Sequence, residues 1–293
     1  MMDNFIIILI SILLEALPFM LAGAIISGFM EVFIPSSLIM RIMPKNPVAA
    51  VFIGAGSGIA LPMCECGSVI IVRRLIKKGM PASAAIAYML AAPIINPITL
   101  LSTYAAYAWF KEMVLLRAAL GIGVAVISGI AVSLFFKKNF LKKTDELQII
   151  NKQEHEPGGK LGHAVRHTID DFMIIFSMLL IGASVVALFK TFAHLSLYEF
   201  FRSEGWLGIP LFSGLAVIFS LCSEADAFVA AAMNGIFDIP AQLAFLAVGP
   251  ILDIKLILLY HSIFTHRMLI FLCTLPLLIV ITAAFMLRGI ILL

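Results

Sequence analysis

The chain has 293 residues, of which 62% are hydrophobic and 13% are charged, and its net charge is +3. A soluble domain carries about 25% charged residues, so this composition excludes a soluble protein. It predicts an all-α polytopic membrane protein of about eight transmembrane helices.

The first part of the chain contains apolar runs of unequal length. Those at 48–61 and 68–76 are each shorter than the roughly 20 residues that a membrane-spanning helix needs. The two runs either cross the membrane together or form separate re-entrant halves. Gly54, Gly56 and Gly58 in the first run should allow close backbone approach to a neighbouring helix. The predicted spans here are 5–30, the pair 48–61 and 68–76, 82–109 and 113–136.

Residues 137–167 differ from the flanking sequence because they are rich in charge, contain Pro157-Gly158-Gly159 and lack a spanning run. We interpret them as a cytoplasmic linker. Later apolar runs predict spans at 169–190, 206–232, 240–264 and 268–287. The predicted domains are a first transmembrane repeat at 1–136, the linker at 137–167 and a second transmembrane repeat at 168–293.

The two halves resemble each other in sequence. AYMLAAPIINPITLL at 87–101 aligns with AFLAVGPILDIKLIL at 244–258, which places Asn96 on Asp253. The break at 64–66 corresponds loosely to 222–226. Eight crossings would make the repeats parallel, whereas one re-entrant segment in each half would allow them to be inverted. Interrupted helices at matching positions predict a binding site between the halves.

Helix-breaking residues interrupt both halves. Pro62 and Gly67 bracket Cys64-Glu65-Cys66, and a later run is predicted to break at Pro93 and again at Asn96-Pro97. We expect the segments 62–67 and 222–226 to be non-helical and to face each other near the membrane midplane. Irregular backbone at that depth is tolerated only inside protein or along a water-filled cavity, so these breaks indicate a pathway.

Cys64 and Cys66 are two residues apart in the first break. Thiolates select soft ions such as Cu(I) or Zn(II), and they also suit trivalent arsenic. The opposing interpretation is that the cysteines are small apolar core residues. We weigh the two equally, with Cys64 and Cys66 as candidate metal ligands.

Polar side chains in or near apolar segments are the other candidates for a substrate pathway. A carboxylate at the bilayer centre costs at least about 2.5 kcal/mol and needs a partner, water or a proton. The alternative is a structural pair, such as Asp253 with Lys255. Asn96, at a helix break, supplies an amide or marks a simple kink. The candidate residues are Cys64, Glu65, Cys66, Asn96, Cys222, Glu224, Asp226 and Asp253.

Basic residues predict the orientation in the membrane. Under the eight-span count, the linker lysines share a side with a dense basic group at 73–78. The positive-inside rule makes that side cytoplasmic. We therefore expect a multi-pass plasma-membrane protein with both termini in the cytoplasm.

The segments LPMCECGSVIIVRRLIKKGMPASAAIAYMLAAPIINP and LCSEADAFVAAAMNGIFDIPAQLAFLAVGPILDIK resemble a bacterial predicted-permease family. That family includes organoarsenical efflux permeases and a branch of two-component permease subunits. Its first break is usually C-x-C-G with a small or polar middle residue, where this chain has Glu65. The resemblance covers nearly the whole chain. It implies a multi-pass plasma-membrane protein and, in the two-component branch, a second membrane subunit.

The leading hypothesis is a secondary permease that exports a soft metal ion or a metalloid such as an organoarsenical. Thiols would hold the cargo and a carboxylate would take up the compensating proton. One alternative is a membrane-embedded dithiol redox enzyme, and another is a non-transporting anchor subunit. No nucleotide-binding or zinc-protease motif occurs, so the chain shows no sign of driving transport with an ATPase of its own. We expect no enzyme activity and no cofactor. The expected partners are the transported species, the lipid bilayer and a second membrane subunit, but no nucleic acid.

Overall fold

The computed structural model of the chain describes residues 46–136, 207–235 and 237–291 continuously, with isolated pieces between 6 and 44 and between 141 and 187. The predicted spans at 5–30 and 169–190 and the linker at 137–167 fall largely outside the described residues.

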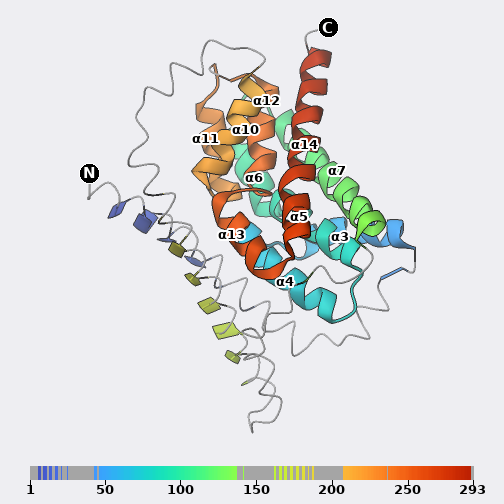
Figure 1. Cartoon of the computed structure of the whole chain (residues 1–293). Helices are drawn as coiled ribbons and strands as arrows, with labels where there is room; N and C mark the ends of the chain where they lie inside the picture. Colours follow the sequence, from blue (N-terminus) through green and yellow to red (C-terminus); the bar gives the residue numbers. More distant parts are fainter. Residues whose placement is uncertain are drawn as a thin grey trace.

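The described residues form ten named helices and no strands, with only two isolated bridges (Figure 1). The prediction of an all-helical fold is therefore confirmed. The helices before the linker are α3 (Pro47–Ala60), α4 (Glu65–Lys77), α5 (Ala82–Ile95), α6 (Pro97–Ala106) and α7 (Glu112–Phe135). Those after it are α10 (Gly208–Phe219), α11 (Ser223–Ala232), α12 (Ile239–Val248), α13 (Ile254–Ile263) and α14 (His266–Ile291).

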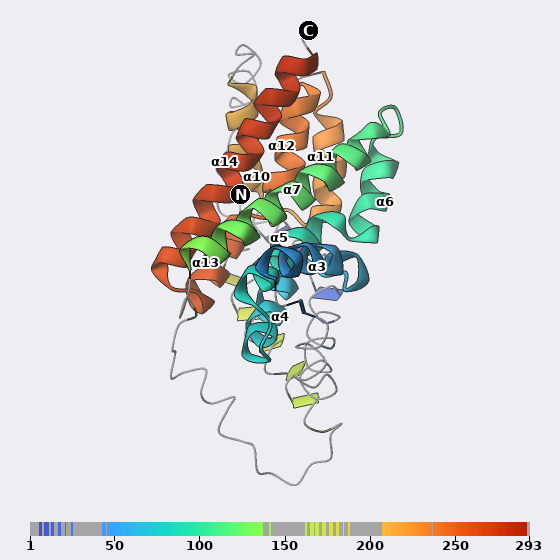
Figure 2. The same cartoon turned by 90° about the vertical axis from the view of Figure 1, so that its right-hand side faces the viewer.

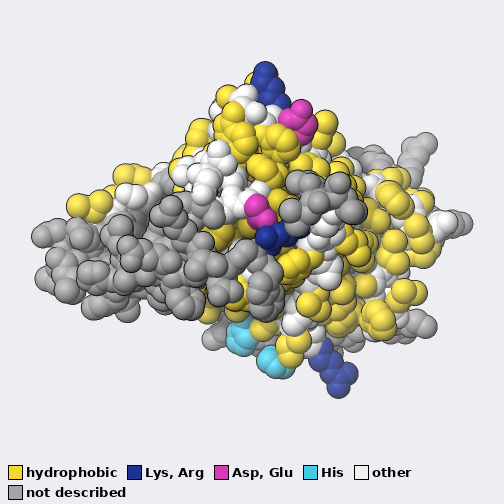
Figure 3. All heavy atoms as spheres, turned by 90° about the horizontal axis from the view of Figure 1, so that it is seen from above, with side chains coloured by type: hydrophobic (Ala, Val, Ile, Leu, Met, Phe, Trp, Pro, Cys, Tyr) yellow, Lys and Arg dark blue, Asp and Glu magenta, His cyan; other side chains and the backbone are white. Residues whose placement is uncertain are grey.

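Three helical stretches within the described residues are long and apolar enough to cross a membrane. They are α5 with α6 (Ala82–Ala106), α7, and α14 (His266–Ile290). Large apolar side chains are exposed on α6, α7 and α14, among them Leu101 at 67%, Leu115 at 73% and Met286 at 71%. Hydrophobic side chains predominate on the described surface in Figure 3. A soluble monomer rarely exposes so much apolar surface, so the chain is a membrane protein.

Short breaks separate α3 from α4, α5 from α6, α10 from α11 and α12 from α13. The local sequence explains each break. Pro97 disfavours a helical backbone at the residue before it, and Asn96 is extended, with φ −59° and ψ 135°. Ser220 ends α10 in the left-handed conformation, with φ 47°. Proline also lies in the other two breaks, Pro62 before α4 and Pro250 before α13. The predicted break at Asn96-Pro97 is confirmed.

Several predicted boundaries are wrong. The break after α3 ends at Cys64, so Glu65 and Cys66 lie in the first turn of α4. Glu224 and Asp226 lie likewise in the first turn of α11, because the break ends at Cys222. The first amides of any helix have no acceptor within that helix. Polar side chains can accept from them, so these residues are as compatible with a helix start as with a loop. Pro93 lies inside α5 and ends no helix. The predicted spans 82–109, 206–232 and 240–264 each consist of two helices.

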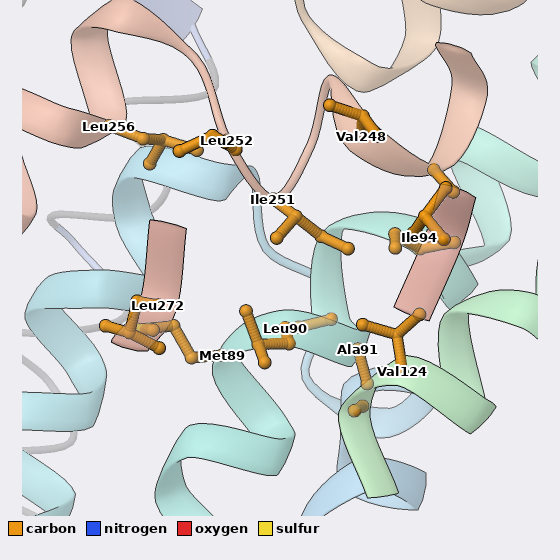
Figure 4. Packing of buried hydrophobic residues seen from close by; sticks show 14 of the residues in the cluster. Met89, Leu90, Ala91, Ile94, Val124, Val248, Ile251, Leu252, Leu256 and Leu272 are labelled. Carbon is orange, nitrogen blue, oxygen red and sulfur yellow. The ribbon is translucent and has the colours of Figure 1, made fainter. Parts of the chain in front are cut away.

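Helices from the two halves pack on each other. Within each half, α3 packs on α5 and α5 on α7, just as α10 packs on α12 and α12 on α14. Between the halves, α4 contacts α13, α11 contacts α6, and the long helices α7 and α14 lie side by side (Figure 2). Figure 4 shows the apolar centre of this junction, where Ile251 lies near Leu90 and Ile94 of α5. The helix breaks therefore lie in a packed core.

The contact between α3 and α5 depends on glycine. A Cβ at Gly54 would overlap the carbonyl oxygen of Ala84, and one at Gly58 would lie 2.8 Å from the Cα of Ala92. A Cβ at Gly56 would meet nothing within 4 Å. The predicted close approach is confirmed for Gly54 and Gly58 and is wrong for Gly56, which is exposed.

We expect Gly54→Ala and Gly58→Ala each to destabilise the protein by about 1–3 kcal/mol, the usual cost of overpacking a core. Gly56→Ala is the matched control, because it adds the same methyl group to the same helix in open space. Its higher helix propensity should leave stability unchanged or slightly raised. Thermal unfolding of the purified variants in detergent measures the difference. Equal melting temperatures for all three would contradict the glycine contact.

Candidate functional site

The candidate site lies at the N-termini of four short helices, α4, α6, α11 and α13. Each directly follows a helix break, and we call these four the half-helices. Side chains cap three of them. Cys64 Sγ accepts a hydrogen bond from the amide of Gly67 at 3.4 Å. Asn96 Oδ1 accepts from Ile98 N at 2.7 Å, and Asp253 Oδ1 accepts from Leu256 N at 2.6 Å. A helix start carries a partial positive charge, so each is a favourable place for a carboxylate.

The first charged cluster consists of Glu65, Asp253 and Lys255. The Lys255 ammonium lies 3.3 Å from Asp253 Oδ2 and 3.7 Å from Glu65 Oε1. All three side chains are at most 3% exposed. The Glu65 contact links α4 of the first half to α13 of the second. Two buried carboxylates thus share one cation, and Glu65 Oε2 has no hydrogen-bond partner in the described ranges of the chain.

Three cysteines lie close enough to this cluster to interact with it electrostatically. Cys64 and Cys66 both lie within electrostatic range of Glu65 and Lys255, and Cys222 lies within range of Lys255. Cys66 and Cys222 are buried, whereas Cys64 is partly exposed. Among the described residues, no group of three or more histidine, cysteine, aspartate or glutamate side chains could hold a metal ion. A preformed metal cage is therefore not present in that part of the chain.

The second charged cluster is centred on Arg117 of α7. Its Nη1 donates a hydrogen bond to Thr103 Oγ1 of α6 at 2.7 Å, and its Nη2 donates to the carbonyl oxygen of Ser223 at 2.9 Å. Thr99 of α6 donates to Glu224 Oε1 of α11 at 3.2 Å. The guanidinium is fully buried. Arg117 therefore joins α6 and α7 of the first half to the start of α11 in the second.

Asp226 completes the second cluster. Its carboxylate and that of Glu224 act electrostatically on Arg117. Asp226 is 1% exposed, and neither of its carboxylate oxygens has a hydrogen-bond partner among the described residues. This cluster resembles the first in one respect, because two carboxylates again lie within electrostatic range of one buried cation.

The structure brings most of the candidate residues into these two clusters. Asn96 is different, since its side-chain oxygen caps α6, as in a simple helix break, and no interaction among the described residues joins it to either cluster. The alternative pairing of Asp253 with Lys255 is observed, although Lys255 is buried and does not reach the membrane surface. Glu65 and Asp253 form ion pairs with Lys255, and Cys64, Cys66 and Cys222 lie within electrostatic range of it. Glu224 and Asp226 lie within electrostatic range of Arg117.

Sequence reasoning missed Arg117 and Thr99, and it considered Lys255 only as a structural partner. The signal for Arg117 is present, because it is a lone cation in the apolar run MVLLRAALGIGV. An arginine inside a spanning segment marks a functional or paired position by default. Thr99 carries no comparable signal, since threonine is common in membrane helices.

Comparison with known proteins supports a transport role. Residues 1–290 match a family model described as predicted permease. The chain is 40% identical over 282 residues to the UPF0718 protein YcgR of Bacillus subtilis, covering 96% of each chain. It is 33% identical over 264 residues to a Streptococcus mutans protein that is named as a two-component membrane permease complex subunit, covering 90% of this chain and 88% of that protein.

A more distant relative is the UPF0718 protein MJ0584 of Methanocaldococcus jannaschii, which is 25% identical over 201 residues, or 68% of this chain and 51% of that protein. No solved structure matches the chain. The family match extends over both charged clusters and all the helix breaks. On that match, the chain belongs to the predicted permease family.

Proposed function

We propose that the protein is a secondary permease, and not an enzyme, whose transport pathway passes between its two halves at the broken helices. The observation that carries this proposal is the pair of charged clusters at the half-helix starts, each bridging the halves. Buried charges are costly in a membrane and are retained chiefly along ion and substrate pathways. A scaffold that only anchors a partner would not require them.

The order of the helices supports two repeats. In each half, two short helices separated by a break precede another broken pair and then a long helix. The first helices of the halves, α3 with α4 and α10 with α11, lie near opposite ends of the molecule in Figures 1 and 2. This placement favours inverted repeats over the parallel arrangement of eight full crossings. Inverted repeats with broken helices place the substrate near the midplane, at the interface of the repeats.

The cargo that fits the cysteines is a soft metal ion or a metalloid species such as an organoarsenical. Cys64 and Cys66 come from the first half and Cys222 from the second, and all three lie within electrostatic range of the Lys255 ammonium group. Soft thiol ligands select thiophilic ions. A pathway needs binding that is weak enough for release, so a few thiols suit passing cargo better than a closed cage.

Two further features complete the proposal. The Streptococcus relative is named as a complex subunit, and we expect this chain to assemble with a second membrane subunit as well. The basic residues at the end of α4, Arg73, Arg74, Lys77 and Lys78, would face the cytoplasm of a plasma-membrane protein. The expectation that both termini share that side does not fit the C-terminus, because the end of α14 and α4 lie at opposite ends of the molecule in Figures 1 and 2.

Growth of a deletion strain on thiophilic metals and trivalent arsenicals tests the substrate class. The wild-type chain should restore resistance. The double variant Cys64→Ser and Cys66→Ser should lose that resistance while reaching the membrane in normal amount, because serine oxygen is a poor ligand for soft ions. Cys273→Ser on α14 is the control and should behave as wild type. Full resistance with both serines would rule out a thiol site at these positions.

A further inference from the structure

Asp226 lies at an unfavourable place for a lone carboxylate. A Cβ added to Gly249 would overlap the Asp226 side chain, so the carboxylate lies directly against that glycine. Gly249 caps the end of α12, where its amide donates to the carbonyl oxygen of Phe245. A helix end carries a partial negative charge of about half an elementary charge. The carboxylate and the end of α12 therefore repel each other unless a cation lies between them.

The neighbouring groups offer too little positive charge to compensate. Arg117 acts electrostatically on Asp226, but its two terminal nitrogens donate to Thr103 and to the Ser223 carbonyl and not to the Asp226 carboxylate. Lys255 of α13 also acts on Asp226, together with the carboxylates Glu65 of α4 and Asp253 of α13. Glu224 adds a carboxylate on α11 itself, and α6, which packs on α11, has no charged side chain. Four carboxylates thus share two cations in this region.

Unpartnered polar atoms mark the same place. Within the part of the chain that the structure describes, both oxygens of Asp226, the hydroxyl of Ser223 and Nε of Arg117 are buried without a hydrogen-bond partner. Ser223 and Asp226 are three residues apart on α11, a spacing that puts two side chains on one face of a helix. Buried polar atoms are almost always paired, so a group of them points to an absent ligand.

We propose that Asp226 binds a singly charged cation, a proton or a sodium ion, with the Ser223 hydroxyl and the carbonyl end of α12 as further ligands for sodium. The described residues provide no cluster of ligands for a multivalent metal, whereas one carboxylate with neutral oxygens suits a single positive charge. Half-helix ends line coupling-ion sites in other transporters. This inference rests on the proposed permease function in one respect, which is that the bound cation acts as the coupling ion. The binding of the cation to Asp226 requires no cargo.

The test measures cation binding to the purified full chain in detergent, without any substrate. One arm follows the melting temperature as NaCl replaces choline chloride at fixed pH, and the other follows it in choline chloride as the pH is lowered. A cation that binds only the folded protein raises its melting temperature. In the arm that supplies the cation bound by Asp226, the melting temperature of the wild type should rise. The Asp226→Asn variant should show no such rise or should need at least tenfold more cation for it. Glu112→Gln, at an exposed position of α7, is the matched control and should respond as wild type.

Ser223→Ala separates the two cations and provides a second variant should Asp226→Asn fail to fold. It should weaken the response to sodium, which uses the hydroxyl as a ligand, and leave the response to acid unchanged. Responses in both arms that are the same for wild type and every folded variant would overturn the cation site. If binding depends on Asp226 but no thiophile resistance depends on Cys64 and Cys66, then the proposed cargo fails and the cation site stands.

Discussion

Replacing Arg117 with methionine is expected to destabilise the protein by about 3–5 kcal/mol, the usual cost of removing one partner of a buried charge group. The substitution removes two hydrogen bonds that connect α7 to Thr103 on α6 and to the start of α11. It also leaves Glu224 and Asp226 without the cation that lies beside them. Methionine is apolar and unbranched and fills the space of the aliphatic part of the arginine side chain, so the loss chiefly reports charge and hydrogen bonding.

Urea or thermal unfolding in detergent measures this loss, and a double variant tests its cause. Adding Asp226→Asn to Arg117→Met should recover part of the stability, since one uncompensated carboxylate is removed along with the cation. The control is Arg288→Met, because Arg288 is 23% exposed and its pair with Asp238 is only a surface contact. Exposed ion pairs contribute about 0–1 kcal/mol. A loss at Arg117 no larger than that at Arg288 would contradict the central position of this guanidinium.

The sequence predicted the helical class and the positions of the breaks because both depend on local chemistry. A composition with few charges identifies a membrane protein, and proline removes a backbone donor wherever it occurs. The helix α7 was predicted to within one residue for the same reason, since its apolar run is continuous. Boundaries at the breaks were less accurate, because a helix can begin at any residue whose cap is satisfied. Cys64 caps α4 through sulfur, which residue preferences do not anticipate.

Partner identity could not be predicted, because it depends on tertiary packing. Glu65 and Lys255 are far apart in sequence, and only the contact between α4 and α13 brings them within 3.7 Å. The matching of Asn96 to Asp253 in the two halves suggested equal roles. Both do cap a helix, yet only Asp253 also holds a buried cation. The similarity of the two halves therefore predicted where the half-helices begin. It did not identify which of these positions forms a buried ion pair.

Replacing Lys255 with methionine is expected to cost about 3–5 kcal/mol and to abolish transport, because Glu65 and Asp253 would then face each other's charge without compensation. The link between the halves is isolated by a double-mutant cycle of Lys255→Met with Glu65→Gln. We expect a coupling energy of about 1–3 kcal/mol, as for other contacting pairs. The matching cycle of Arg288→Met with Asp238→Asn keeps the cap on α12, since asparagine caps a helix as well as aspartate does.

The exposed pair should couple by less than about 1 kcal/mol. The nitrogen–oxygen distances of the two pairs are similar, 3.7 Å between Lys255 and Glu65 and 3.3 Å between Arg288 and Asp238. The pairs differ in burial, because Lys255 and Glu65 are buried whereas Arg288 and Asp238 are partly exposed. The buried pair is stronger only if water is excluded from the junction between α4 and α13. Equal coupling in the two cycles would mean that water reaches Lys255 in the resting protein. In that case the ion pair could not hold the two halves together, and the pathway would already be open at this cluster.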